Sequence, residues 1–166
     1  MTEDIVRRKG YLTLGSRLRR IGERLQAETQ KLMADHNVSI QANQYPMLSA
    51  IDENGPLSIG DLSVALGVSQ PGVTRSVGHL AKLGVVAVSR IESDQRTRLV
   101  VLTDHGRELV RLGRTTVWPQ IEHCLADILS GQSGPLLKQL DHLEDALRQA
   151  SFSQRASEWS GGRDNG

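Results

Sequence analysis

Polar and small side chains recur on one side of the segment 69–83. Val73, Val77 and Leu80 follow each other at helical spacing, so they predict the inward face of a helix. Hydrogen-bond donors and small residues on the other side suit the base edges and phosphates of a DNA major groove, which is about 12 Å wide. The expected contacts on this segment are Ser69, Gln70, Gly72, Thr74, Arg75, Ser76 and His79. The alternative is an ordinary solvated helix face.

The start of this helix decides how closely it can approach a polyanion. Pro71 falls in the first turn, where its missing N–H costs nothing, and Gly72 has no side chain to hold the helix terminus away from phosphates. Arg75 is the candidate for a bidentate contact to guanine or phosphate, and Gln70 is the candidate for an adenine edge. The chemistry expected here is recognition of a duplex.

A second group of cations follows in a segment with a different period. β-Branched runs at 85–91 and 96–102 flank a polar, charged tip, which predicts a β-hairpin. Arg96 could enter a minor groove, where narrow A·T-rich stretches attract guanidinium groups. Arg90 and Arg98 flank the tip and could touch phosphates; alternatively, they keep the edge of the ribbon from aggregating.

Two short helices are expected immediately before the hairpin. Ser58 and Asp61 have the spacing of a capping box, with Asp in place of Glu, and they predict a helix that ends at Gly67. Ser69 is the N-cap candidate of the next helix, which stops at Gly84. Two short helices joined by a turn that contains a glycine are typical of a helix-turn-helix, and the hairpin that follows is its wing.

Amphipathic helices are expected on both sides of this unit. Apolar residues recur in steps of three and four over 11–32, and a shorter helix follows Ser39. Thr103 caps another helix, in which Pro119 is expected to introduce a kink. A last helix carries a leucine stripe over 136–147.

One small winged domain cannot cover the apolar stripes at both ends of the chain. We therefore expect the stripes to pair across a two-fold axis, the alternative being an intramolecular core. Two recognition helices about 34–36 Å apart would then read a pseudo-palindromic site. The expected dimerisation residues are Leu14, Leu18, Ile21, Leu25, Leu136, Leu140, Leu143 and Leu147.

The 166 residues are the length of a single domain. Within this domain, 1–166, we expect dimerisation helices over 11–36 and 103–150, the winged helix-turn-helix over 39–102 and a flexible tail over 151–166. The net charge is only +1, but the helix and hairpin at 69–102 hold five Lys or Arg against two Asp or Glu. This local excess suits a polyanion, although solvated surfaces often have the same balance.

Composition and spacing argue against several other classes of protein. No apolar run is long enough to cross a bilayer and no secretion signal is present, so we expect a cytoplasmic protein with no membrane partner. We expect no metal and no cofactor, because the five histidines form no His-x-x-x-His pair and zinc-finger spacing is absent. Cys124 lies on the apolar rhythm of its helix, where thiols are usually inert packing. No nucleophile elbow or phosphate-cradling glycine loop indicates an enzyme.

Four short motifs follow one another along the chain. They are Gly55-Pro56-Leu57-Ser58-Ile59-Gly60-Asp61-Leu62, then Leu66-Gly67-Val68-Ser69, then Asp94-Gln95-Arg96, and then Leu102-Thr103-Asp104-His105-Gly106. Each alone is a weak signal, but four in this order and spacing are specific. Together they resemble the MarR family of bacterial transcriptional regulators, with its wing-tip Asp-x-Arg and its Leu-Thr-x-x-Gly. The resemblance covers residues 11–150 and departs from the family at Pro46 and at Pro71-Gly72.

The resemblance implies a mainly α fold with a small β-hairpin wing, in which the winged helix-turn-helix is joined to N- and C-terminal dimerisation helices. It implies a homodimer that binds double-stranded DNA at a pseudo-palindromic operator and regulates transcription, more often as a repressor. Asp94 would hold an arginine of the wing by a charge-assisted bond, or it is simply a turn-capping residue. The alternative function is a winged-helix protein-interaction module that binds no DNA.

A small aromatic or amphipathic effector is the usual signal of this family, bound between the dimerisation helices and the winged domain. The residues that could line such a cleft here are Met33, Tyr45, Met47 and Trp118. Residues of these types more often belong to the core, and the sequence leaves both interpretations open.

Overall fold

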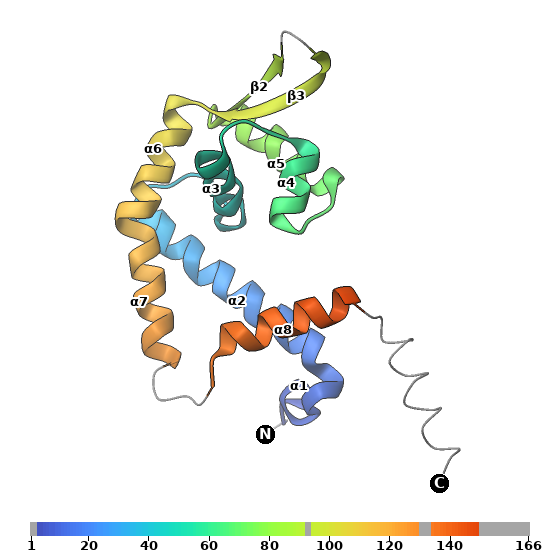
Figure 1. Cartoon of the computed structure of the whole chain (residues 1–166). Helices are drawn as coiled ribbons and strands as arrows, with labels where there is room; N and C mark the ends of the chain where they lie inside the picture. Colours follow the sequence, from blue (N-terminus) through green and yellow to red (C-terminus); the bar gives the residue numbers. More distant parts are fainter. Residues whose placement is uncertain (1–2, 92–93, 130–133, 150–166) are drawn as a thin grey trace, which may run out of the picture. The chain divides into compact units, whose positions relative to one another are not determined.

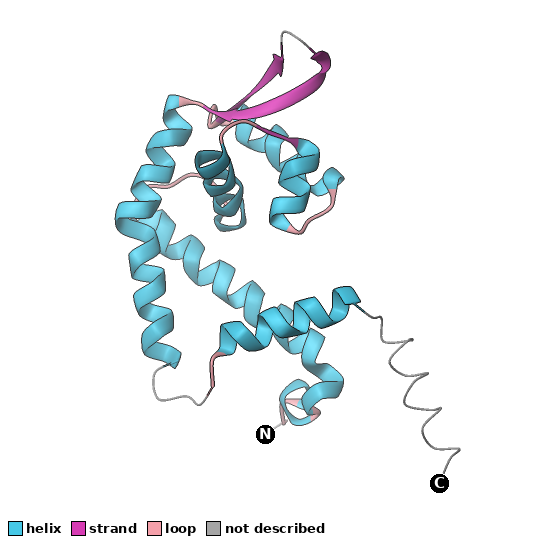
Figure 2. Cartoon of the chain, viewed as in Figure 1, coloured by secondary structure: helices cyan, strands magenta, loops and turns pink. Residues whose placement is uncertain are grey.

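The computed structural model describes residues 3–91, 94–129 and 134–149, with the side chains of 90–97 and of part of the last helix outside the description. The chain divides into two compact units, Met1–Leu125 and Ala126–Gly166. The elements are α1 (Ile5–Arg8), η1 (Gly10–Thr13), α2 (Leu14–Asp35), η2 (Ala42–Gln44), α3 (Tyr45–Asn54), β1 (Leu57–Ser58), α4 (Ile59–Leu66), α5 (Gln70–Lys82), β2 (Val86–Ile91), β3 (Asp94–Leu102), α6 (Asp104–Leu112), η3 (Gly113–Val117), α7 (Trp118–Leu129) and α8 (Leu136–Gln149) (Figure 1). The expected class, mainly α with a small β wing, is confirmed (Figure 2).

The long N-terminal helix begins later than its apolar rhythm predicts. A 3-10 turn occupies Gly10–Thr13, and the α-helix starts at Leu14. Gly10 has a positive φ of 55°, a conformation that glycine adopts without steric cost. Tyr11, the first residue of the apolar stripe, is 94% exposed in this chain.

The helix α3 shows how the chain accommodates Pro46. The helix begins at Tyr45, so the proline falls in its first turn, the one place where the missing N–H is tolerated. The preceding turn η2 is closed by a reciprocal capping box between Gln41 and Gln44. The helix ends at Asn54, before Gly55 with φ of 78°.

Aliphatic residues and methionines form one core in the first unit. The helices α3, α4 and α5 and the hairpin pack around it (Figure 1). The fully buried members with the largest side chains are Met33, Ile40, Leu48, Leu62, Leu80, Val73, Val85, Val100, Val110 and Val117. The scarcity of aromatic residues therefore does not prevent a dense core, since Leu, Val and Ile interdigitate well.

The helix-turn-helix consists of α4 and α5, joined at Gly67. The Ser58 hydroxyl accepts a hydrogen bond from the Asp61 N–H at 3.1 Å, and the Asp61 carboxylate accepts one from the Ser58 N–H at 3.2 Å. Gly67 is left-handed, with φ of 64°, and its N–H closes the last turn of α4. The predicted capping box and glycine stop are both confirmed.

Replacement of Ser58 by alanine should lower the stability of the protein by about 1 kcal/mol, because it removes the oxygen that satisfies the first turn of α4. The melting temperature should fall by roughly 2–4 °C in a chain of this size. Thermal unfolding followed by circular dichroism measures the change. Ser16, which is exposed in α2, provides the control, because alanine at that position should be neutral or slightly stabilising. Equal melting temperatures for the two variants would contradict the capping role.

The sheet has the order β1-β3-β2, with all pairs antiparallel. The short strand β1 joins the hairpin through Leu57, which pairs with Val100. The hairpin is confirmed, but β3 begins at Asp94, two residues earlier than the β-branched run predicts. The pairing shifts between Arg90 and Ile91, and such a bulge increases the local twist of the ribbon.

The helix after the wing is interrupted before Pro119 by a π segment, and not by the kink expected at Pro119 itself. The chain forms α6, then a wider π segment over Gly113–Val117, then α7 with Pro119 in its first turn. Because proline has no N–H to donate to the preceding turn, the widened turn before it absorbs the irregularity. Gly113 lies against Tyr45, where a Cβ would come 2.5 Å from Cε1 of the ring.

The second unit contains α8, which the leucine stripe predicted. Leu136 is 44% exposed and Leu140 is half-buried. The side chains of Leu143 and Leu147 lie outside the described residues. No helix in the described part of the chain is long and apolar enough to span a bilayer.

Candidate nucleic-acid interface

The helix α5 has the two faces that its sequence predicts. Val73 and Leu80 are fully buried and Val77 is 5% exposed. The expected contacts lie on the other side, where Gly72 and Ser76 are half-buried. The exposed ones are Ser69, Gln70, Thr74, Arg75 and His79. The buried valines and leucine therefore fix the rotation of the helix and present the polar side chains to solvent.

The first turn of α5 is compact. Ser69 is the N-cap residue in extended conformation, and Pro71 lies in the first turn without breaking it. A Cβ on Gly72 would come 3.3 Å from the Ser69 hydroxyl oxygen, closer than most real contacts. The Thr74 hydroxyl donates to the Gln70 carbonyl at 2.9 Å. The departure from the family at Pro71 and Gly72 therefore leaves a regular helix start.

Arg75 differs from most described arginines in its charge environment. Arg19, Arg107 and Arg111 form ion pairs with a carboxylate on their own helix, as exposed arginines often do. Arg75 is exposed and has no ion-pair partner among the described residues. Its guanidinium is thus available for an external anion or a guanine edge.

His79, one turn before the end of α5, contacts a buried amide. The Gln44 side chain is 4% exposed, and its Nε2 lies 3.0 Å from Nδ1 of His79. The Gln44 Oε1 accepts a hydrogen bond from the Gln41 N–H at 3.1 Å. Sequence reasoning assigned His79 to the outward face but found no signal for Gln44, which is 35 residues away.

The wing carries arginines at opposed positions of its ladder. Residues 90 and 98, both arginines, are direct partners in the register of β2 and β3. The side chain of Arg98 is exposed. The side chains of Arg90, Asp94 and Arg96 lie outside the described residues, so their expected contacts stay predictions.

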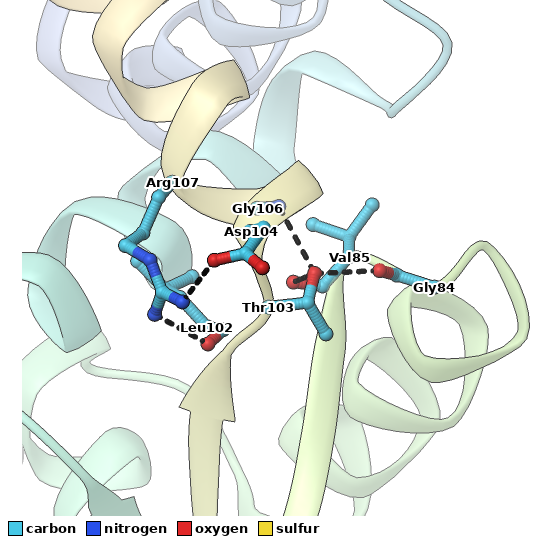
Figure 3. A network of polar contacts seen from close by, with 7 residues as sticks. All are labelled: Gly84, Val85, Leu102, Thr103, Asp104, Gly106 and Arg107. Carbon is cyan, nitrogen blue, oxygen red and sulfur yellow. Dashed lines mark hydrogen bonds and ion pairs between the residues drawn. The ribbon is translucent and has the colours of Figure 1, made fainter.

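The Leu-Thr-x-x-Gly motif joins the wing to α6 and to the end of α5 (Figure 3). The Thr103 hydroxyl donates to the Gly84 carbonyl at 2.6 Å, lies 3.0 Å from the Val85 carbonyl, and accepts from the Gly106 N–H at 3.1 Å. The predicted capping role of Thr103 is confirmed, and its second role is to hold the chain that leaves α5. Arg107 donates to the Leu102 carbonyl at 3.0 Å and pairs with Asp104. The motif positions the wing through these contacts.

The residues expected to line an effector cleft lie in or against the core. Met33 is fully buried, Met47 is 3% exposed, and Trp118 packs against the core partly buried. The Tyr45 hydroxyl donates to the Leu109 carbonyl at 2.8 Å. The rings of Tyr45 and Trp118 pack edge to face, with 5.8 Å between their centroids. Burial raises the pKa of Tyr45, which keeps the phenol protonated as a donor. These contacts suit packing, and an effector role for the four residues stays a prediction.

A different, open cavity of about 410 Å³ lies between α2 and η2. Its lining is rich in amides and consists of Gln26, Ala27, Gln30, Gln41, Ala42 and Asn43. Gln30 ties these two elements together, because its Nε2 donates to the Ile40 carbonyl at 3.1 Å and its Oε1 accepts from the Ala42 N–H at 2.8 Å. None of the four residues expected for an effector lines this cavity.

The predicted apolar stripe of α2 is accessible in the single chain. Leu18, Ile21 and Leu25 are 37%, 44% and 43% exposed, and Leu14 is half-buried. Cys124 is also exposed, so the expectation of buried packing for it is wrong within one chain. Its helix position lies about 100° from that of Leu125, away from the half-buried side. Among the described residues no His, Cys, Asp and Glu cluster could hold a metal ion.

Two short helices joined by a tight turn and followed by a β-hairpin, which pairs with the upstream strand β1 in a three-stranded sheet, define a winged helix-turn-helix protein. Residues 37–97 match the sequence profile of the MarR family. Over this segment, the resemblance to the MarR family that the motifs indicated is confirmed.

The curated relative BadR of Rhodopseudomonas palustris, named a transcriptional activatory protein, is 36% identical over 74 residues. The match spans 42% of this chain and 42% of BadR. The structure of BpsR of Bordetella bronchiseptica, whose DNA binding is regulated by 6-hydroxynicotinic acid, is also similar to this chain. The two are 28% identical in sequence and superpose with a TM-score of 0.64, over 82% of this chain and 94% of BpsR. The transcriptional repressor CouR, solved on a 23-mer DNA duplex, shares the fold at 23% identity, with a TM-score of 0.65 over 89% and 98% of the two chains.

Proposed function

We propose that this protein is a sequence-specific DNA-binding regulator of transcription. The observation that carries the proposal is the exposed polar face of α5, on which Arg75 has no carboxylate partner among the described residues. A helix of this kind enters the major groove by its N-terminal half, and an unpaired guanidinium there contacts guanine or phosphate. The relatives named above regulate transcription or bind DNA, which supports the same function.

The register of the wing supports a polyanion as the partner. Like charges directly opposite each other in an antiparallel pair are destabilising, and the ladder places Arg90 opposite Arg98. Phosphates beside the ribbon would offset this repulsion.

The regulator acts as a homodimer on a pseudo-palindromic operator in this proposal. The exposed stripe at Leu18, Ile21 and Leu25 supplies apolar surface for a second copy. A small aromatic or amphipathic effector would shift the distance between the two recognition helices and change the affinity for DNA. We place the protein in the cytoplasm with its DNA, and we assign it binding rather than catalysis.

We further propose repression as the direction of control. CouR is named a repressor and BadR an activatory protein, so the family fold serves both. Transcription in vitro from a promoter that overlaps the selected site decides the direction, because a repressor lowers the amount of transcript and an activator raises it.

Selection of duplexes from a random-sequence pool by the full chain tests the function. We expect an enriched sequence with two related half-sites. Substitution of Arg75 by alanine should lower affinity for the selected duplex by roughly 10-fold or more, and lower it less for random duplex, because a bidentate base contact discriminates by about 1–3 kcal/mol. Fluorescence anisotropy at several salt concentrations measures both affinities.

Arg96 should act differently from Arg75 if it contributes charge near phosphates. Its replacement by alanine should reduce the slope of log K against log salt by about 1. Arg111, whose charge is paired with Glu108 on α6, is the control, and its replacement by alanine should leave the slope and the specificity unchanged. A duplex affinity independent of salt, with silent Arg75 and Arg96 variants, would refute the function in favour of protein interaction.

A further inference from the structure

The contact between Gln44 and His79 links the buried core to the exposed face of the recognition helix. Among the described residues, Gln44 is the one polar residue that is buried. His79 is exposed on α5, among the expected DNA contacts. Their side chains meet at 3.0 Å, between Nε2 of Gln44 and Nδ1 of His79. A buried amide that contacts an exposed imidazole fixes the position of that imidazole.

The surroundings of Gln44 determine which way its amide points. The Gln41 N–H, a donor only, lies 3.1 Å from Oε1 of Gln44. If the amide were reversed, its NH₂ group would face this N–H and two donors would oppose each other. The amide oxygen therefore faces Gln41, and the NH₂ group faces His79.

This orientation in turn determines the tautomer of His79. An NH₂ group donates, so the Nδ1 of His79 must accept and carries no proton. The proton of the neutral ring then resides on Nε2, which has no protein partner in the described part of the chain. The exposed side of α5 thus presents an N–H donor of fixed position beside Arg75.

We propose that Gln44 is a positioning residue for DNA recognition, which holds His79 so that its Nε2–H donates to an acceptor on the duplex. The inference rests on the proposed DNA-binding function. The acceptor is a phosphate oxygen or the O6 or N7 atom of guanine, all of which accept from an N–H donor. Gln44 itself does not touch DNA in this arrangement and acts through His79.

Two substitutions of His79 separate its two nitrogens. The Oδ1 of asparagine can occupy the place of Nδ1 and accept from Gln44, whereas asparagine has no donor at the place of Nε2. The NH₂ group of glutamine reaches the place of Nε2 but leaves Gln44 without its acceptor. We expect His79→Asn to keep the melting temperature and to lose roughly 3- to 10-fold in affinity for the selected duplex, the range of one hydrogen bond. We expect His79→Gln to retain more affinity than His79→Asn.

A double-mutant cycle tests the role of Gln44. Gln44→Met should lower DNA affinity by a similar factor in the native chain, and it should have no further effect in a His79→Ala chain. Gln30→Met is the matched control, because Gln30 holds the same segment through Ile40 and Ala42 without contact to His79. A coupling to His79 as large for Gln30 as for Gln44 would attribute the effect to packing of the segment and overturn the proposal.

The tautomer is measured without DNA. Long-range ¹H–¹⁵N correlation spectra of the full chain should show an unprotonated Nδ1 and a protonated Nε2 for His79. Gln44→Glu should place a proton on Nδ1 of His79, because a carboxylate can only accept a hydrogen bond and so favours an N–H at that nitrogen. A protonated Nδ1 in the native chain would overturn the proposal.

The comparison of selected and random duplexes identifies the acceptor. An equal loss of affinity for both duplexes on His79→Asn indicates phosphate, and a loss confined to the selected duplex indicates a base edge; both outcomes support the donor role. If the native chain selects no duplex, the proposed function fails while the spectra still test the Gln44 contact. If the native chain binds DNA and both Gln44→Met and His79→Asn are silent, only the present inference fails.

Discussion

Replacement of Gly106 by alanine is expected to destabilise the protein by about 3 kcal/mol or more. A Cβ at this position would lie 2.2 Å from the Val85 carbonyl oxygen and 3.2 Å from Cδ2 of Leu102. The first of these contacts is with backbone, which cannot rotate away as a side chain can. The strand or the helix must therefore shift to admit a single methyl group.

The shift would disturb the junction that positions the wing. The Val85 carbonyl accepts from the Thr103 N–H at 3.1 Å, and the Gly106 N–H donates to the Thr103 hydroxyl. Separation of Gly106 from Val85 therefore strains the contacts that join α6 to the start of β2. The glycine of the Leu-Thr-x-x-Gly motif is required for close approach of two backbones, and its φ is not positive.

Thermal unfolding measures the expected loss. A melting temperature roughly 6–12 °C below that of the native chain corresponds to about 3 kcal/mol in a chain of this size. Gly78 is the matched control, because a Cβ there meets nothing within 4 Å in the middle of α5. Gly78→Ala should raise stability by up to about 1 kcal/mol through helix propensity. Similar melting temperatures for the two variants would show that the Gly106 contact is not tight.

Local signals predicted the parts of the fold that short segments determine. The capping box at Ser58 and Asp61, the glycine stop at Gly67 and the change of period after Gly84 each act within a few residues. The helix-turn-helix and its wing could be found from the sequence for this reason. The inward face of α5 followed from helical spacing in the same way.

Contacts between distant segments were not predictable in the same way. Gln44 meets His79 across 35 residues, and Thr103 meets Gly84 across 19. The π segment before Pro119 also depends on packing, since Gly113 lies against Tyr45 from α3. No periodicity in the sequence reports such pairs, because a buried glutamine reads as an ordinary polar residue until its neighbours are known. The outward side of α5 was therefore predictable, while the groups that contact its side chains from other elements were not.

The exposed stripe of α2 leads to the second large effect. Ile21→Glu is expected to convert the proposed homodimer into single chains. It should also lower affinity for a duplex with two half-sites about 100-fold or more, because binding of the second half-site then ceases to be intramolecular. Ile21 is 44% exposed between Leu18 and Leu25, so a glutamate there is solvated in a single chain and need not affect its fold. Two such carboxylates brought together across a two-fold axis would be desolvated without a counter-charge.

Light scattering of the native chain and the variant measures the change in mass, and anisotropy with duplexes of one and two half-sites measures the loss of avidity. Ala34→Glu is the control, since position 34 is exposed on α2 about 220° around the helix from Ile21. It adds the same charge away from the stripe and should leave both the dimer and the affinity intact.

The single half-site duplex should bind the Ile21 variant and the native chain alike, because the exposed polar face of α5 is unchanged. A dimeric Ile21→Glu chain with native affinity would show that the two copies join elsewhere, and a monomeric native chain would remove the two-fold arrangement from the proposed function.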